Sequence, residues 1–219
     1  MTVMKPFAAV LALAAITMPA QSPALRFRSG QAGQAGASPT VALQNASVRA
    51  YRTMADALAR VPHGPGVVVW LETSPPDKEV RVLWMDDVAA VPALAAVNGP
   101  VVVVQPLERA AAGATPTPSE SRPGDAQFTG MSLVRVFENA RVSVRRAHMD
   151  ADAREGVHTH GADIVVVHVS GGEIEDTANG KTVVNRWKPG DVEFEARGSS
   201  HSARNVGQPI DVVLVELKP

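Results

Sequence analysis

The sequence contains no cysteine in its 219 residues. This excludes disulfide bonds, a thiolate nucleophile and cysteine metal ligands, so an exported domain would depend on its own core. Aromatic residues make up only 4%, and valine dominates the apolar set. Valine is stiff at χ1 and packs well on pleated surfaces, which predicts a core made mostly of sheet. The net charge is −1 with no basic stripe, which argues against a nucleic-acid partner.

The chain also has no apolar run long enough to span a bilayer comfortably. The run from Pro6 to Met18 follows the positive Lys5 and precedes small residues. This pattern predicts a signal peptide over residues 1–24, cleaved after Ala20 or Ala24. The alternative is an uncleaved membrane anchor. Cleavage would leave a periplasmic or secreted protein without stable membrane insertion.

Two loose segments divide the rest of the chain. Residues 25–39 and 110–130 are rich in Gly, Ala, Ser and Pro and predict flexible linkers. Between and after them lie units at 40–109 and 131–219. Helical signals are few: residues 54–60 could form one or two turns, and Pro92 interrupts the Ala-rich stretch 87–97.

Short β-branched runs bounded by turn residues predict strands in both units. In the first unit they cover residues 66–71 and 100–104. In the second unit they cover residues 141–146, 163–169, 182–187, 192–195 and 211–216. The fold class predicted from these runs is all-β.

The two units resemble each other in sequence. QNASV (44–48) matches ENARV (138–142), and HGPG before one valine run (63–66) matches HGAD before another (160–163). Trp84 followed by Val88 matches Trp187 followed by Val192, and 97–100 matches 205–209. Matches in one order predict two copies of one folding unit. Chance similarity among valine-rich strands is the alternative.

His158 and His160 are the first candidate metal ligands. On a strand, residues i and i+2 point to the same face, with Cβ atoms about 7 Å apart. Two imidazoles at that spacing can converge on one ion at about 2.0–2.1 Å from each nitrogen. A ligand from a neighbouring strand would complete a facial set that leaves open positions for a substrate.

The surrounding residues resemble the two motifs of the cupin superfamily. GVHTHGADI (156–164), with Gly171 beyond it, is similar to the first motif: glycine, His-x-His, glutamate and a later glycine. GDVEFEARGSSHSARN (190–205) is similar to the second motif, whose histidine corresponds to His201. The resemblance covers most of residues 131–219. It implies a jelly-roll barrel (a double-stranded β-helix) that holds a divalent transition metal, Fe, Mn, Ni or Zn, through His158, His160 and His201.

Three residues depart from the family pattern. Gly156 lies closer to His158 than in the motif, and Ala196 replaces a proline. Ile164 stands where the family has its glutamate ligand, and isoleucine cannot bind a metal. Asp163 could substitute only if a bulge redirected it, because neighbouring residues on a regular strand face opposite ways. The expectation is therefore a site of three histidines, with a vestigial empty site as the alternative.

Other charged residues offer candidates for substrate contacts. His168 shares the parity of Ile164, but at about 3.3 Å per residue it lies roughly 13 Å along the strand, too far to reach the ion. Glu193 and Glu195 share parity, so both face inward or both outward, and Arg145 and Arg197 could hold an anion.

The unit at 40–109 keeps only His63, which aligns with His160. It is therefore predicted to be a degenerate cupin-like copy without metal, packed against the second unit. The whole chain would then be a bicupin.

Three functions stay open at this point. The first is a metal-dependent enzyme of oxygenase, isomerase or lyase type acting on a small polar substrate. The second is a periplasmic barrel that binds metal or a small ligand without turnover. The third is a structural barrel with an empty pocket. Cupins often pair, so a homodimer also stays open. Fold resemblance alone does not decide between these functions.

Overall fold

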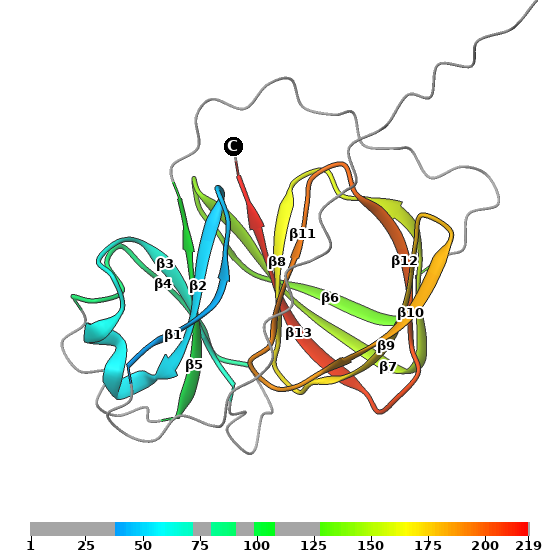
Figure 1. Cartoon of the computed structure of the whole chain (residues 1–219), viewed down its shortest axis with the longest axis horizontal. Coiled ribbons are helices and arrows are strands. Elements are labelled where there is room, and N and C mark those ends of the chain that lie inside the picture. Colours follow the sequence, from blue (N-terminus) through cyan, green and yellow to red (C-terminus); the bar gives the residue numbers. More distant parts are fainter. Residues whose placement is uncertain (1–37, 72–79, 91–98, 108–127, 219) are drawn as a thin grey trace, which may run out of the picture.

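The computed structural model describes residues 38–71, 80–90, 99–107 and 128–218. Within these ranges the regular structure is β-strand in two antiparallel sheets, apart from one short 3-10 helix, η1 (Ala55–Arg60) (Figure 1). The all-β prediction is confirmed, and η1 lies in the stretch expected to form one or two turns. The predicted signal peptide and most of both predicted linkers lie outside the described residues. No helix in the described ranges is long and apolar enough to cross a membrane.

The first sheet has five strands in the order β1-β2-β5-β3-β4. Their bounds are β1 (Thr40–Gln44), β2 (Val48–Met54), β3 (Gly66–Trp70), β4 (Val82–Met85) and β5 (Pro100–Pro106). The valine runs at 67–69 and 101–104 lie on the neighbouring strands β3 and β5 and are fully buried. Because alternate residues of a strand point to opposite faces, an unbroken run of buried valines means that both faces of the sheet are covered at its centre.

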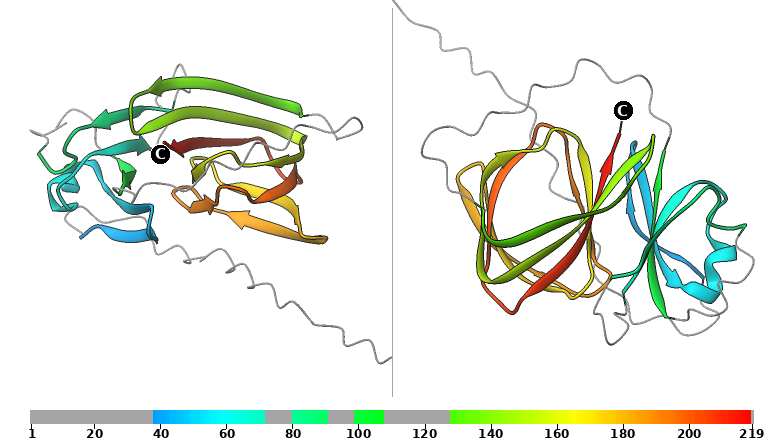
Figure 2. Two further views of the ribbon diagram at one scale, coloured as in Figure 1. Left: turned by 90° about the horizontal axis from the view of Figure 1, so that it is seen from above. Right: turned by 180° about the vertical axis from the view of Figure 1, so that it is seen from behind.

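The second sheet is larger and curls into a barrel (Figures 1 and 2). Its order is β10-β9-β12-β7-β13-β8-β11, with β6 also paired to β7. The bounds are β6 (Thr129–Glu138), β7 (Val142–Thr159), β8 (Asp163–His168), β9 (Gly172–Ala178), β10 (Lys181–Trp187), β11 (Val192–Glu195), β12 (Ser200–Asn205) and β13 (Ile210–Leu217). The rings of His168 on β8 and Trp187 on β10 stack at 4.3 Å, which brings the two sides of the curled sheet together.

The first sheet repeats the strand order of part of the barrel. The order β1-β2-β5-β3-β4 matches β6-β7-β13-β8-β11, pair for pair. The turn between the first two strands is also repeated: the side chains of Asn45 and Asn139 each accept hydrogen bonds from the backbone N–H groups two and three residues on. This agrees with the first two sequence matches between the units.

The other two sequence matches are out of register. Trp84 pairs with Val67 as Phe194 pairs with Val165, so the structural counterpart of Trp84 is Phe194 and not Trp187. The last match is also shifted. Val101 lies opposite the last residue of β3, and Val212 lies opposite the last residue of β8, so Val101 and Val212 are structural counterparts, which the alignment of 97–100 with 205–209 does not bring together. Both matches rest on similar local composition. The connecting loops differ in length between the two units, so similar residues do not occupy equivalent strand positions.

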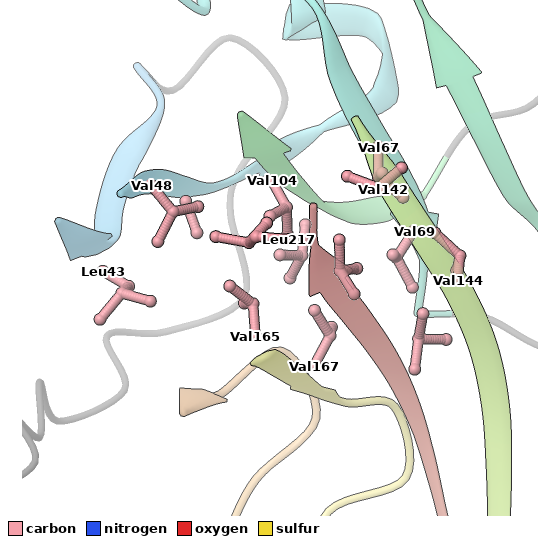
Figure 3. Close-up of a cluster of buried hydrophobic side chains, with 14 of the residues drawn as sticks. Leu43, Val48, Val67, Val69, Val104, Val142, Val144, Val165, Val167 and Leu217 are labelled. Atoms are coloured by element: carbon pink, nitrogen blue, oxygen red, sulfur yellow. The ribbon is translucent and has the colours of Figure 1, made fainter. Parts of the chain in front are cut away.

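The two sheets pack face to face through one apolar cluster (Figure 3). Val67, Val69 and Val104 come from the first sheet, and Val165 and Val167 from the second. Ion-pair and hydrogen-bond contacts border this cluster: Arg52 pairs with Asp191 at 3.1 Å, and the Ser47 hydroxyl donates to Asp163 at 2.9 Å. The first sheet therefore supports one outer face of the barrel and leaves the barrel interior open for a site.

Candidate metal centre

Three histidines converge inside the barrel, as the sequence predicts. His201 on β12 lies directly opposite His158 on β7, so both side chains leave the same face of the sheet. His160 follows β7, and its backbone exchanges hydrogen bonds with the turn at 198–199. The ring centroids lie 4.7–5.0 Å apart, and one potential ligand atom from each ring lies within 4.8 Å of the others. Among the described residues, this is the group of histidines and carboxylates whose geometry suits an ion.

Hydrogen bonds orient two of these rings. His158 Nδ1 lies 2.9 Å from the Gly156 carbonyl oxygen, so Nδ1 donates and Nε2 is left for an ion. His201 Nδ1 lies 3.0 Å from a carboxylate oxygen of Asp176 on β9. A carboxylate that holds the far nitrogen of a histidine is the usual outer partner of a metal ligand. The residues present therefore fit a divalent transition metal.

The pKa values of the cluster show how strongly the groups interact. Burial lowers the pKa of His160 to about 4, with a further contribution from the neighbouring His201 and His158. Burial also lowers the pKa of His201, but its hydrogen bond to Asp176 and the nearby carboxylates outweigh burial and raise that pKa to about 9. The cluster without metal thus holds one strongly basic and one weakly basic imidazole, 3.1 Å apart between Nε2 atoms.

A carboxylate not assigned to the metal set from the sequence lies against the histidines. Glu195 on β11 has one oxygen 3.6 Å from His160 Nε2 and the other 3.8 Å from His201 Nε2. Burial, followed by repulsion from Glu193, raises the pKa of Glu195 to about 8. In the strand pairing, Glu195 lies directly opposite Ile164, the residue that replaces the family's glutamate. The sequence showed only that Glu193 and Glu195 share a face, and the structure shows that both line the cavity.

Asp163 does not turn toward the histidines. Its side chain is buried between the sheets, where it accepts hydrogen bonds from the Ser47 hydroxyl and the Arg197 backbone N–H. β8 is regular through Asp163 and Ile164, so the bulge required to redirect Asp163 is absent from this strand. Asp163 therefore connects the two units and contributes no ligand.

The histidines lie at the wall of a cavity of about 530 Å³. His168, Arg145 and Arg197 line this cavity as well. His168 faces the interior, as its parity predicts. Arg145 is half-exposed and forms an ion pair with Glu216 at 3.5 Å. Two buried guanidinium nitrogens of Arg197, Nε and Nη2, have no hydrogen-bond partner among the described residues.

His63 in the first unit is not part of a comparable cluster of metal-binding side chains among the described residues. Its side chain is 81% exposed and bonds only to Asp87 among the contacts seen in the described residues, at 2.8 Å. It contributes to no metal-binding group there.

The curled antiparallel sheet and the convergence of both histidine motifs inside it decide the fold of the carboxy-terminal unit. This unit is a cupin barrel. The first sheet has the strand order of five of the barrel's eight strands, and its descent from a second cupin copy stays a prediction.

Solved structures similar to the chain include several cupins. A cupin domain from Bordetella pertussis Tohama I matches at 22% identity and a TM-score of 0.40, over 43% of this chain and 99% of that one. KdgF from Halomonas sp. matches at 17% identity and a TM-score of 0.36, over 47% of this chain and 88% of KdgF. The DMSP lyase DddQ from Ruegeria pomeroyi matches at 18% identity and a TM-score of 0.38, over 47% of this chain and 56% of the lyase. No family model and no curated protein matches the sequence.

Proposed function

We propose that this protein is a metal-dependent enzyme that binds one divalent transition ion through His158, His160, His201 and Glu195. The ion would be Fe, Mn, Ni or Zn, and it would supply Lewis-acid chemistry to a small anionic substrate. The observation that carries the proposal is the convergence of three imidazoles, two of them oriented through Nδ1, beside the half-buried carboxylate of Glu195.

The charges of the cavity wall favour a bound cation. Glu155, Asp176, Glu193 and Glu195 lie on this wall. The raised pKa of Glu195 reflects burial among other carboxylates, and a divalent ion would compensate that negative charge. With Glu195 as a ligand the centre keeps one net positive charge, which suits an anionic substrate group.

Arg197 supports an anionic substrate independently of the metal. Arg197 lines the cavity, and its buried Nε and Nη2 atoms have no hydrogen-bond partner among the described residues. A guanidinium offers two parallel donors that match a carboxylate or a phosphate. A substrate carboxylate held by Arg197 would be oriented within the same cavity as the ion.

Metal analysis of the purified protein tests the proposal. After anaerobic reconstitution with Fe(II), Mn(II), Ni(II) or Zn(II), mass spectrometry should find about one ion per chain. His158→Ala and His201→Ala should each remove it. His63→Ala is the matched control, because this exposed histidine should leave the metal content unchanged. A wild-type protein that retains none of the four ions contradicts the proposal.

Turnover distinguishes an enzyme from a barrel that only holds its ligand. Small carboxylates that raise the melting temperature of the metal-loaded protein would be incubated with it and followed by proton NMR. Conversion by the wild type and its loss in His201→Ala support catalysis. Binding without conversion across all such ligands supports the non-catalytic barrel.

The export and assembly of the protein are proposed on the sequence. The segment 1–24 supports export to the periplasm or the medium after cleavage near Ala20 or Ala24. N-terminal sequencing of the exported protein tests this, and an intact Met1 on a membrane-bound product contradicts it. The homodimer stays a prediction that sedimentation of the purified protein can check.

A further inference from the structure

A second polar group lies in the same cavity, away from the histidine cluster. His168 is 1% exposed and Asn185 is 3% exposed, and both line the cavity. Neither ring nitrogen of His168 nor the Asn185 side-chain oxygen has a hydrogen-bond partner among the described residues. Buried polar atoms in native proteins are rarely left unpaired, so two such side chains on one cavity wall point to a ligand.

The geometry around His168 is well defined. One face of its ring stacks on Trp187 at 4.3 Å with an interplanar angle of 13°. Its Nε2 atom lies 3.8 Å from a carboxylate oxygen of Glu193, which is too long for a hydrogen bond. Trp187 and Asn185 are two residues apart on β10 and therefore share a face. The ring is held in place by packing, while its polar atoms stay available.

The distance between the two polar groups sets the length of a ligand. Ile164 lies opposite Glu195 at the metal centre, and His168 lies four residues further along β8. At about 3.3 Å per residue this is roughly 13 Å along the strand. The cavity wall also carries apolar side chains: Met149, Ile164, Val166, Ile174, Val212 and Leu214. A ligand that reaches both groups needs two polar ends and an apolar middle.

The atoms available at the second group select the chemistry of the distal end. The Asn185 oxygen only accepts hydrogen bonds, whereas a neutral His168 donates from one nitrogen and accepts at the other. A carboxylate end would meet the carboxylate of Glu193. An ammonium end would be attracted by Glu193 but would leave the N–H of His168 unpaired. A hydroxyl group both donates and accepts, so it satisfies both residues.

We propose that His168 and Asn185 form a second ligand subsite that hydrogen-bonds a hydroxyl group of an elongated hydroxycarboxylate whose anionic end lies at the metal centre. This inference rests on the proposed function for the position of the anionic end. The recognition of the hydroxyl depends only on His168 and Asn185.

Matched ligand pairs test the subsite. Zn(II)-loaded protein would be titrated calorimetrically with ω-hydroxycarboxylates of five to eight carbons and with the plain carboxylates of the same lengths. At one or more lengths the hydroxylated member should bind about tenfold more tightly, because the plain member leaves the buried polar atoms unpaired. His168→Phe and Asn185→Leu should each remove that preference, and His63→Phe at the exposed histidine should keep it.

Thermal unfolding separates ligand recognition from a structural role. His168→Phe keeps the stacking on Trp187 and removes two unpaired polar atoms, so the melting temperature without ligand should stay the same or rise. A fall in melting temperature together with an unchanged hydroxyl preference overturns the proposal. The absence of a hydroxyl preference in the wild type at every chain length also overturns it.

Nitrogen-15 NMR of the His168 ring keeps this test separate from the metal proposal. If the wild type retains no zinc, the proposed function fails, and the same ligand pairs are then added to metal-free protein. A shift of the His168 ring nitrogens with the hydroxylated member alone supports the subsite. Equal shifts, or none, with both members contradict it.

Discussion

Glu195 on β11 lies directly opposite Ile164 on β8, and its carboxylate lies within 3.8 Å of two of the three clustered histidines. Directly opposed residues in an antiparallel pair project from the same face of the sheet. A carboxylate on β11 therefore reaches the place that a glutamate at position 164 would reach from β8. A carboxyl side chain therefore stands at that point of the barrel, supplied by the neighbouring strand.

The first prediction concerns this carboxylate as a metal ligand. Glu195→Gln keeps the shape of the side chain and removes its charge. The affinity for Zn(II) or Mn(II) should fall at least as much as it does on loss of an outer partner of a ligand, roughly 10- to 100-fold. Competition with a chelating dye measures the change. Glu193→Gln, on the same strand and face but against His168, is the comparison and should change the affinity far less, because it removes a nearby charge and not a ligand.

Exchanging the side chains at positions 164 and 195 tests the same prediction more stringently. Ile164→Glu combined with Glu195→Ile moves the carboxylate back to the position of the family motif. The double variant should bind metal more tightly than Glu195→Ile alone. If it binds no better, a carboxylate at this point in the barrel does not contribute to metal affinity.

The histidines were predictable from the sequence because their spacing is local. His158 and His160 are two residues apart, and His201 lies in a second motif of fixed length. The role of Glu195 was not predictable, because it depends on the pairing of β11 with β8. Parity placed Glu193 and Glu195 on one face but did not say which face is interior.

Some strands were also predictable from the sequence, and others were not. Valine runs such as 101–104 predicted the buried strands closely. The strands β9 (Gly172–Ala178) and β12 (Ser200–Asn205) were missed, because they consist mainly of polar residues that are half-buried in the barrel wall. Their strand conformation comes from pairing with neighbouring strands, which a propensity argument does not see.

The second prediction concerns Asp176 as the partner of His201. Asp176→Asn weakens the hold on His201 Nδ1 and should lower metal affinity about 10- to 100-fold. The ring nitrogens of His201 should also shift in nitrogen-15 NMR spectra of the metal-free protein. Glu175→Gln, the preceding residue on the opposite face of β9, should change neither. Unchanged affinity in Asp176→Asn would mean that other contacts orient His201.

The third prediction concerns Asp163 between the two sheets. Asp163→Ala removes acceptors for the Ser47 hydroxyl and the Arg197 N–H, and should lower the free energy of unfolding by about 1–3 kcal/mol. Chemical denaturation measures this loss, and metal content should stay near one ion per chain. Ser47→Ala removes only the contact between the sheets and should cost less. Loss of metal at unchanged stability would instead identify Asp163 as a ligand.

The fourth prediction concerns pH and the metal-free protein. The folded pKa of Glu195 is raised to about 8 and that of His201 to about 9, from ordinary values of 4.5 and 6.5. Each group then binds a proton in the folded state that the unfolded chain has released, so its contribution to stability is lost as pH rises toward the folded pKa. His160, with its pKa lowered to about 4, acts in the opposite direction and only below pH 6.5.

Stability of the metal-free protein should therefore fall as pH rises from about 6.5 to about 9, with Glu195 and His201 both contributing up to about pH 8 and His201 alone above it. Urea unfolding at fixed ionic strength measures this slope. Metal affinity should rise over the same range, because the ion displaces the protons held by these two residues. Glu195→Gln should flatten the lower part of the slope, up to about pH 8, while the part due to His201 persists. A metal-free wild type whose stability is constant from pH 6.5 to 9 would show that the cluster does not hold these protons.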